Sequence, residues 1–461
     1  MSNLLHRLLI LVLLLSFGGQ IVNAQEKVFF GNLHSHTSYS DGLGTPKQAY
    51  TYARDVAKLD FIALTEHNHL AAMGTDNIGI AANHALYNGS DPNSLISNAN
   101  AFTKNDQFIA LYGQEFSTIS SGNHTNVFDI GEVIDVAKGR FDLLDIFLQA
   151  NKDTSGQTAI LMFNHPQNTA DLLPTEYGLD DFGGDPVQWL NGMGKYARLI
   201  QMINGPGQSP GTNLNSARPD ETAFRKFLNL GFKLAPTADQ DNHQKNWGNA
   251  TNARTGIIAT SLTKANLLDA MRKRHVYATE DKNLSVIIKV NGSLCGDIIA
   301  PLPPPGELSI TYSINDADEP NADYEIQVWR DAVGDEPAKM VSAVTTSAGS
   351  GQVEDVAFSG EAQYFYFKII QKDEDGNEDR AWTAPVWFQN ASDPLESLTT
   401  DVGTGPSASE ALFVASKKSE VYHISNECLD AKRIKPTNLV TGPDAKKGRR
   451  LHENCPRRGP N

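Results

Sequence analysis

Long apolar runs are scarce in this sequence. The most apolar stretch, residues 8–15, is too short to span a bilayer, which argues against a transmembrane anchor there. Arg7 precedes it and the small residues Val22 and Ala24 follow, which is typical of a secretory signal cleaved near Ala24. The residue directly after that point is Gln25 and not a cysteine, so a lipoprotein anchor is not supported. We therefore expect a signal peptide over residues 1–24 and a secreted or periplasmic protein with no membrane anchor in the mature chain.

Positive charge is also scarce, with 39 Lys and Arg against 54 Asp and Glu and a net charge of -15. Such an acidic chain discourages non-specific binding to nucleic acid. Residues 411–461 differ, with 11 Lys and Arg against 5 Asp and Glu. Nucleic acid or another acidic polymer could bind this basic segment, although solvated charged turns also explain such a composition.

The 461 residues are more than one hydrophobic core usually holds, so two or three domains are expected. Residues 25–283 alternate short apolar runs with amphipathic segments, and helices are predicted at residues 46–58, 141–152, 221–230 and 264–274. Thr45 is the expected N-cap of the first helix, with Pro46 in its first turn. The alternation predicts a mainly parallel sheet, either open or closed into a barrel.

The pattern changes after residue 283. Residues 284–390 read as alternating or aromatic-rich strands separated by turn residues, which predicts an immunoglobulin-like or fibronectin-like β-sandwich. Residues 391–410 have the composition of a linker, and residues 411–461 form a module small enough to need a metal or a disulfide.

Potential metal ligands cluster where the predicted strands of the first domain end. Two histidines separated by one residue lie on the same side of an extended chain, as in His34-Ser35-His36. Further candidates lie at the ends of other predicted strands. The full set is His34, His36, Asp41, His67, Glu115, His124, His165, Asp241 and His243. The carboxyl ends of parallel strands open onto one face, so these side chains are expected to meet there.

Each candidate has an ordinary alternative, such as a solvated strand end or a turn cap at Asp239 and Asp241. Taken together, however, 6 of the 12 histidines fall at predicted strand ends beside carboxylates. One zinc ion takes four ligands, so this set implies two or three divalent ions, with Glu115 able to bridge two of them. Mixed nitrogen and oxygen ligands fit Zn, Mn or Fe.

The order of these motifs resembles the PHP superfamily, named for polymerase and histidinol phosphatase. The motifs are H-x-H with a downstream Ser-Asp-Gly, then Thr-Glu-His-Asn, an isolated Glu, a His, Asn-His-Pro and finally Asp-x-His, over residues 28–279. Residues 236–248, 274–281 and 381–387 are similar to secreted members that resemble carbaryl hydrolase. The resemblance implies a distorted (β/α)7 barrel in which the nine candidates hold a trinuclear metal centre. Glu66 departs from the family, which often has Asp there, and this affects the surroundings of the ligands more than the ligands themselves.

The resemblance and the ligand set together predict a metal-dependent phosphoesterase that hydrolyses a small or polymeric phosphate mono- or diester. Glu115 is then both a ligand and a catalytic group. His69 is expected either to protonate the leaving group or to orient His67, and Arg254 to hold the substrate anion. A second hypothesis is a carbamate or carboxylic ester hydrolase with the same site. A third is a non-catalytic, metal-stabilised protein that binds a surface polymer.

Cysteine is the scarcest ligand type, with three residues in the chain. His423, Cys428, His452 and Cys455 weakly resemble the small zinc module of Ada-type DNA repair proteins, except that His452 stands where the family has a cysteine. A four-ligand zinc site and a Cys428–Cys455 disulfide are both open, and the export signal favours the disulfide, which would leave Cys295 unpaired.

Overall fold

A computed structural model describes residues 25–68, 87, 89–116, 124–134, 140–166, 173–207, 219–331 and 338–392, and short strands at 414–416, 421–423, 439–441 and 450–451. The predicted signal peptide and most of the linker and C-terminal module, including Cys428, His452 and Cys455, lie outside these residues, as does His69. Cys295 is a free, buried cysteine. Within the described residues, no helix is both long enough and apolar enough to cross a membrane.

Residues 27–279, here called the α/β part, alternate strands and helices as predicted. The strands are β1 (Lys27–Asn32), β2 (Phe61–His67), β3 (Ile109–Phe116), β4 (Thr125–Phe128), β5 (Ile160–Phe163), β6 (Ala197–Asn204), β7 (Ala235–Asp239), β8 (Arg254–Ala259) and β9 (Val276–Thr279). The helices are α1 (Pro46–Asp55), α3 (Leu95–Phe102), α4 (Phe141–Ala150), α5 (Leu173–Glu176), the 3-10 helix η2 (Leu179–Phe182), α6 (Pro186–Met193), α7 (Glu221–Asn229) and α8 (Lys264–Arg272).

The four predicted helices are present as α1, α4, α7 and α8, each ending one to three residues before the predicted end. Thr45 caps α1 as expected: its side chain accepts a hydrogen bond from the Gln48 N–H, and the Gln48 side chain accepts one from the Thr45 N–H. This reciprocal capping box satisfies two backbone donors that the first turn leaves free. Local sequence signals therefore fix where α1 begins.

The strands of the α/β part lie in one large mixed sheet, in the order β9-β8-β1-β2-β3-β4-β5-β6-β7. The expectation of a mainly parallel sheet needs correction at two places. β4 is antiparallel to both β3 and β5, and β8 is antiparallel to β1 and β9. Only eight residues separate β3 from β4, whereas a parallel crossover needs a dozen or more, so this connection can only return antiparallel.

Alternate residues of β2 face two different apolar clusters. Ile62 and Leu64 pack with Ala49 and Tyr50 of α1, on the face that the helices cover. The opposite face of β2 contributes to a second cluster shared with β3, β5, β6, β7 and β8, whose members include Phe61, Ala63, Ile109, Leu111, Ile160, Met162, Leu199, Ala235 and Ile257. One inner core thus joins strands that are far apart in the sheet order.

The segments that follow β1 and β7 also lie side by side. Ser35 forms an isolated parallel bridge with Asn242, and the His36 N–H donates to the Asn242 carbonyl at 2.9 Å. Earlier along the same two segments, the Asn32 side-chain amide donates to the Ala238 carbonyl at 3.3 Å. These contacts bring the first and last parallel strands of the α/β part together.

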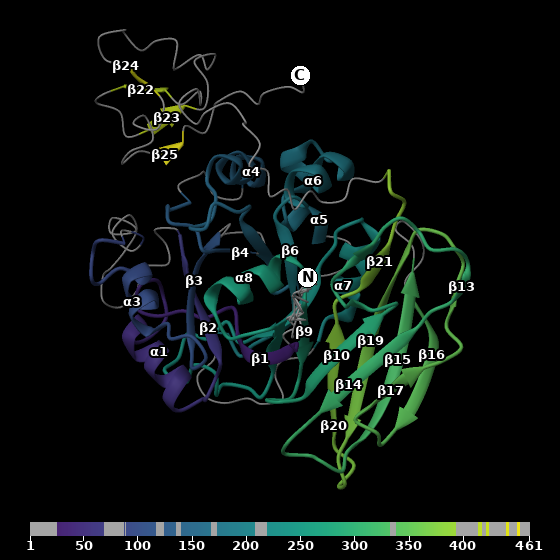
Figure 1. Cartoon of the computed structure of the whole chain (residues 1–461). Helices are drawn as coiled ribbons and strands as arrows, with labels where there is room; N and C mark the ends of the chain where they lie inside the picture. The colour runs from purple at the N-terminus through teal and green to yellow at the C-terminus, as the bar shows by residue number, and fades with distance from the viewer. Residues whose placement is uncertain are drawn as a thin grey trace, which may run out of the picture.

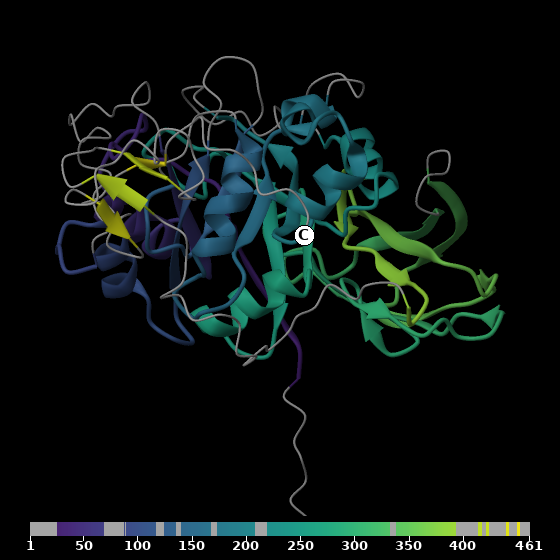
Figure 2. The same ribbon diagram turned by 90° about the horizontal axis from the view of Figure 1, so that it is seen from above.

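Residues 285–388, here called the β-rich part, lie on one side of the α/β part, whereas α1 and α3 lie on the other (Figure 1). Figure 2 shows the same arrangement from above. The strands are β10 (Ser285–Val290), β11 (Ser293–Leu294), β12 (Ile298–Ile299), β13 (Gly306–Glu307), β14 (Ile310–Asn315), β15 (Asp323–Asp331), β16 (Lys339–Thr346), β17 (Ser350–Val353), β18 (Ala357–Phe358), β19 (Gln363–Lys372), β20 (Glu378–Thr383) and β21 (Val386–Phe388).

Two sheets of the β-rich part share one apolar core. Val286 and Ile288 of β10 pack in the same cluster as Val328 of β15 and Phe367 of β19. β20 also pairs with β9, with Ala381 opposite Thr279, so the main sheet continues across the predicted domain boundary near residue 283. The C-terminal strands are β22 (Val414–Ser416), β23 (Val421–His423), β24 (Leu439–Thr441) and β25 (Arg450–Leu451).

Candidate metal centre

The nine predicted ligands lie at or just beyond strand ends of the α/β part. His67 ends β2, Glu115 is the penultimate residue of β3, and His124 immediately precedes β4. The others follow strands: His34, His36 and Asp41 follow β1, His165 follows β5, and Asp241 and His243 follow β7. His67 and Glu115 occupy the same strand face as the inner apolar cluster, because they continue the alternation of Phe61, Ala63, Ile109 and Leu111. The inner core therefore ends in a layer formed by these nine side chains, here called the histidine layer.

The fully buried carboxylate of Glu115 is the centre of this layer. Its Oε1 atom lies 3.1 Å from His34 Nε2, 3.0 Å from His124 Nδ1 and 3.4 Å from His165 Nε2. Its Oε2 atom lies 2.9 Å from His67 Nδ1 and 3.3 Å from His36 Nε2. Five imidazoles thus surround one carboxylate, and both of its oxygens are used.

Asp41 and Asp241 complete the layer on the other side of His36. Asp241 Oδ1 lies 3.1 Å from His36 Nε2 and 3.3 Å from His34 Nε2. Asp41 Oδ1 lies 3.1 Å from His243 Nε2 and 3.5 Å from His67 Nε2. The structure therefore brings all nine predicted side chains together.

Eight of these side chains form three overlapping groups. Within each group, one ligand atom from every residue lies within 4.8 Å of the others. The groups are His36, Asp41, His67 and His243; His34, His36, Glu115 and Asp241; and His67, Glu115 and His124. Each pair of groups shares one residue, His36, His67 or Glu115. His165 joins them through Glu115 and through its ring, 4.9 Å from that of His124. These groups could hold divalent metal ions.

The charges of the site fit a cation. Burial alone would raise the pKa of Glu115, but His34, His124 and His67 hold it well below its ordinary value. Burial would lower the pKa of His34, but Asp241 and Glu115 raise it to about 9. The Nε2 atoms of His34 and His36 lie only 3.2 Å apart, so two neutral acceptors there would repel each other. Protons or metal ions must stand between these lone pairs, and metal ions displace such protons.

A hydrogen-bonded shell fixes the ligands. Glu66, which is 1% exposed, accepts hydrogen bonds from the Thr37 N–H, the Thr37 hydroxyl and the Ser40 hydroxyl, and Ser40 Oγ lies 3.3 Å from His36 Nδ1. Glu66 thus orders the loop that carries His36 and Asp41. The predicted effect of a Glu in place of the family's Asp stays a prediction.

Gln201 of β6 was not predicted. Its Oε1 accepts a hydrogen bond from the His165 N–H at 2.9 Å and lies 3.3 Å from His34 Nδ1, so one amide positions two ligands. Asn164 similarly donates to Glu115 Oε1 at 2.9 Å. The available signal for Gln201 was its place as a polar residue between the apolar residues Ile200 and Met202, two residues after Leu199 of the inner cluster.

Arg254 is buried, and its guanidinium donates to the carbonyls of Thr251 and Ala253 at 2.9 and 2.8 Å. Burial lowers its pKa to about 10. None of these contacts involves the nine ligands, and its predicted role as a substrate anchor stays a prediction. Arg274 is also buried, where it donates to the Gly296 carbonyl and stacks over Trp387.

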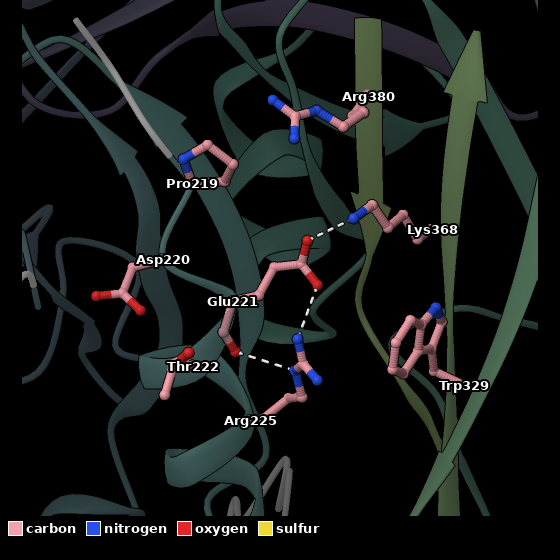
Figure 3. A pocket seen from close by; sticks show the side chains of 8 residues that line it. All are labelled: Pro219, Asp220, Glu221, Thr222, Arg225, Trp329, Lys368 and Arg380. Carbon is pink, nitrogen blue, oxygen red and sulfur yellow. Dashed lines mark hydrogen bonds and ion pairs between the residues drawn. The ribbon is translucent and has the colours of Figure 1, made fainter. Parts of the chain in front are cut away.

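A separate pocket of about 640 Å³ lies between the N-terminus of α7 and strands β15, β19 and β20. None of its lining residues belongs to the nine ligands. Figure 3 shows Lys368 and Arg225 both directed at Glu221, at 2.6 and 3.0 Å. Arg380 is bound to Glu280 at 2.6 Å. The cations of this pocket are therefore already neutralised, which makes the histidine layer the stronger candidate site.

Comparison with family models and with curated proteins finds no match for this chain. Among solved structures, one similar chain is the PmoD soluble domain from Methylocystis sp. ATCC 49242 (Rockwell), at 15% sequence identity and a TM-score of 0.18. The match covers 23% of this chain and 90% of that chain. A likeness at this level carries no inference about fold or activity.

Proposed function

We propose that this protein is an exported metal-dependent phosphoesterase of the PHP superfamily. The observation that carries the proposal is the convergence of nine His, Asp and Glu side chains, from the ends of six separate strands, in one layer centred on Glu115. A purely structural role would not need so many buried ionisable groups in one place, because burying charge is costly unless it is compensated.

Two features of the fold support the finer assignment to a distorted (β/α)7 barrel. The inner apolar cluster joins β2, β3, β5, β6, β7 and β8, as the interior of a closed sheet would. The Ser35–Asn242 bridge then joins β1 to β7 at the mouth. The β-rich part, with its two sheets over one core, is the proposed immunoglobulin-like sandwich.

The donor set suits Zn, Mn or Fe, since imidazole and carboxylate ligands are mixed. When bound, such ions would acidify a water molecule and polarise the ester that it attacks. The residues of the three overlapping groups would hold the ions, with Glu115 shared between two groups. We propose two or three ions, as expected from the number of ligands.

Other residues of the protein position the ligands, and the site is largely buried. Gln201 fixes His34 and the backbone of His165, and Glu66 fixes the loop after β1. Seven of the nine side chains have relative exposures below 20%, so the developing charge would be stabilised where water screens it little. Proton donation by His69 remains part of the proposal.

The test combines elemental analysis of the purified full chain with three substrates: an aryl phosphate monoester, an aryl phosphodiester and naphthyl methylcarbamate. We expect bound Zn, Mn or Fe and turnover of a phosphate ester that a chelator abolishes. Turnover of the carbamate alone would favour the ester hydrolase. Full metal loading with no turnover of any of the three would favour a binding protein.

A further inference from the structure

Three carboxylates meet in the β-rich part, where it joins the α/β part. Asp281 follows β9, Glu319 lies between β14 and β15, and Asp379 lies in β20. One oxygen from each lies within 4.8 Å of the others. Among the described residues, none of the three has an ion-pair partner. The nearby cations are used elsewhere, since Arg380 binds Glu280 and Lys372 binds Glu378.

A fully buried amide, Gln371 of β19, points into the same cluster. Its Nε2 donates to Glu319 Oε2 at 2.7 Å and to Asp316 Oδ2 at 3.0 Å. Gln371 is also the direct cross-strand partner of Asp379, so both side chains project from the same face of the sheet. Its Oε1 atom is buried and has no hydrogen-bond partner. A buried carbonyl oxygen without a partner is costly, and a bound cation would satisfy it.

The electrostatics support the same conclusion. Partial burial and the charges of Asp316, Asp281 and Asp379 raise the pKa of Glu319 to about 7. Burial, Asp281 and Glu280 raise the pKa of Asp379 to about 6. At neutral pH these carboxylates therefore repel one another, and either a shared proton or a cation must offset the repulsion.

We propose that Asp281, Glu319, Asp379 and the Gln371 side-chain oxygen form a calcium site. All of the donors are oxygens, which Ca²⁺ prefers, and none is the imidazole or thiolate that Zn²⁺ favours. The ligands come from the segment after β9, the β14–β15 loop, β20 and β19. Calcium would therefore tie the end of β9 to both β20 and the β14–β15 loop, and so hold the β-rich part against the α/β part.

The experiment titrates CaCl₂ into the full chain, with its other metals bound, by isothermal titration calorimetry and by thermal unfolding. We expect one saturable site with Kd between about 10⁻⁵ and 10⁻³ M, as in calcium sensors and extracellular modules, and a rise in Tm. Asp379→Asn and Glu319→Gln should abolish both signals. Asp318→Asn, which removes an exposed carboxylate from the same loop, should retain both.

A fourth variant, His243→Ala, keeps the calcium response if the new site is independent of the histidine layer. The folded state of Asp379→Asn is checked in calcium-free buffer, where its Tm should equal or exceed that of the wild type because repulsion is removed. The absence of heat and of a Tm shift in the wild type up to ~10 mM calcium would overturn the proposal. An equal response in Asp379→Asn would overturn it as well, and would leave proton sharing as the means of neutralisation.

Discussion

His67 on β2 and Glu115 on β3 are direct partners in a parallel pair, and Nδ1 of the histidine lies 2.9 Å from Oε2 of the carboxylate. Backbone hydrogen bonds of two buried strands hold this pair, so its geometry does not depend on the loops that carry the other ligands. The pair therefore provides a rigid base on which His34, His36 and Asp241 are assembled.

The first prediction concerns Glu115→Gln, which keeps the shape of the side chain and removes its negative charge. Because both carboxylate oxygens contact histidines, we expect the loss of bound metal and a fall in turnover of more than about 100-fold, the upper range for residues that only support ligands. Elemental analysis and steady-state kinetics measure the two effects. Unchanged metal content would contradict the role of Glu115.

The second prediction concerns Gln201→Leu. Gln201 holds His34 and the His165 backbone, so its loss should weaken metal affinity by about 10- to 100-fold while the protein remains folded. Competition with a chromogenic chelator measures this affinity.

Gln114→Leu is the matched control for Gln201. Gln114 is also a fully buried glutamine, but its amide contacts the backbone of Glu132 and Ile134, and it faces the opposite side of β3 from Glu115. This variant should lower the stability and leave the metal affinity unchanged. Equal metal affinity in both variants would show that Gln201 is only structural.

The third prediction concerns Asp281, Glu319 and Asp379, here called the acidic cluster, which should make the stability of the protein depend on pH. Asp379 has its folded pKa raised to about 6 by burial, Asp281, Glu280, Asp316 and Asp373, above the ordinary value of 3.8. Folding then favours the protonated form, so this contribution to stability is present below about pH 4 and is lost as the pH rises through 6.

The measurement is the Tm of the wild type minus that of Asp379→Asn, in calcium-free buffer at pH 5 and pH 8. We expect this difference to become more negative at pH 8. A difference that stays constant or moves in the other direction would show that Asp379 is not crowded by like charge.

The sequence predicted the histidine layer because its ligands follow apolar runs, and strand ends are visible in a sequence. His34, His36, His67, Glu115 and His165 all carry this signal. Gln201 was not predicted because an amide between apolar strand residues has no chemical signature until the fold places it beside two histidines.

The acidic cluster could not be predicted for a different reason. Asp281, Glu319 and Asp379 are widely separated in the chain and meet only because β20 pairs with β9 and β19. The antiparallel direction of β4 was also not predicted. The prediction of a parallel sheet rested on the strand and helix pattern and did not weigh the eight-residue connection between β3 and β4.

The most direct test of the metal centre is the metal-to-protein ratio of the purified full chain, measured for the wild type, His243→Ala and His275→Ala. His275 is a partly buried histidine paired with Asp297, outside the nine ligands, and is the matched control. The account predicts two to three ions in the wild type and in His275→Ala, and fewer in His243→Ala. A wild-type ratio below one after incubation with Zn or Mn, or equal ratios in all three proteins, would contradict it.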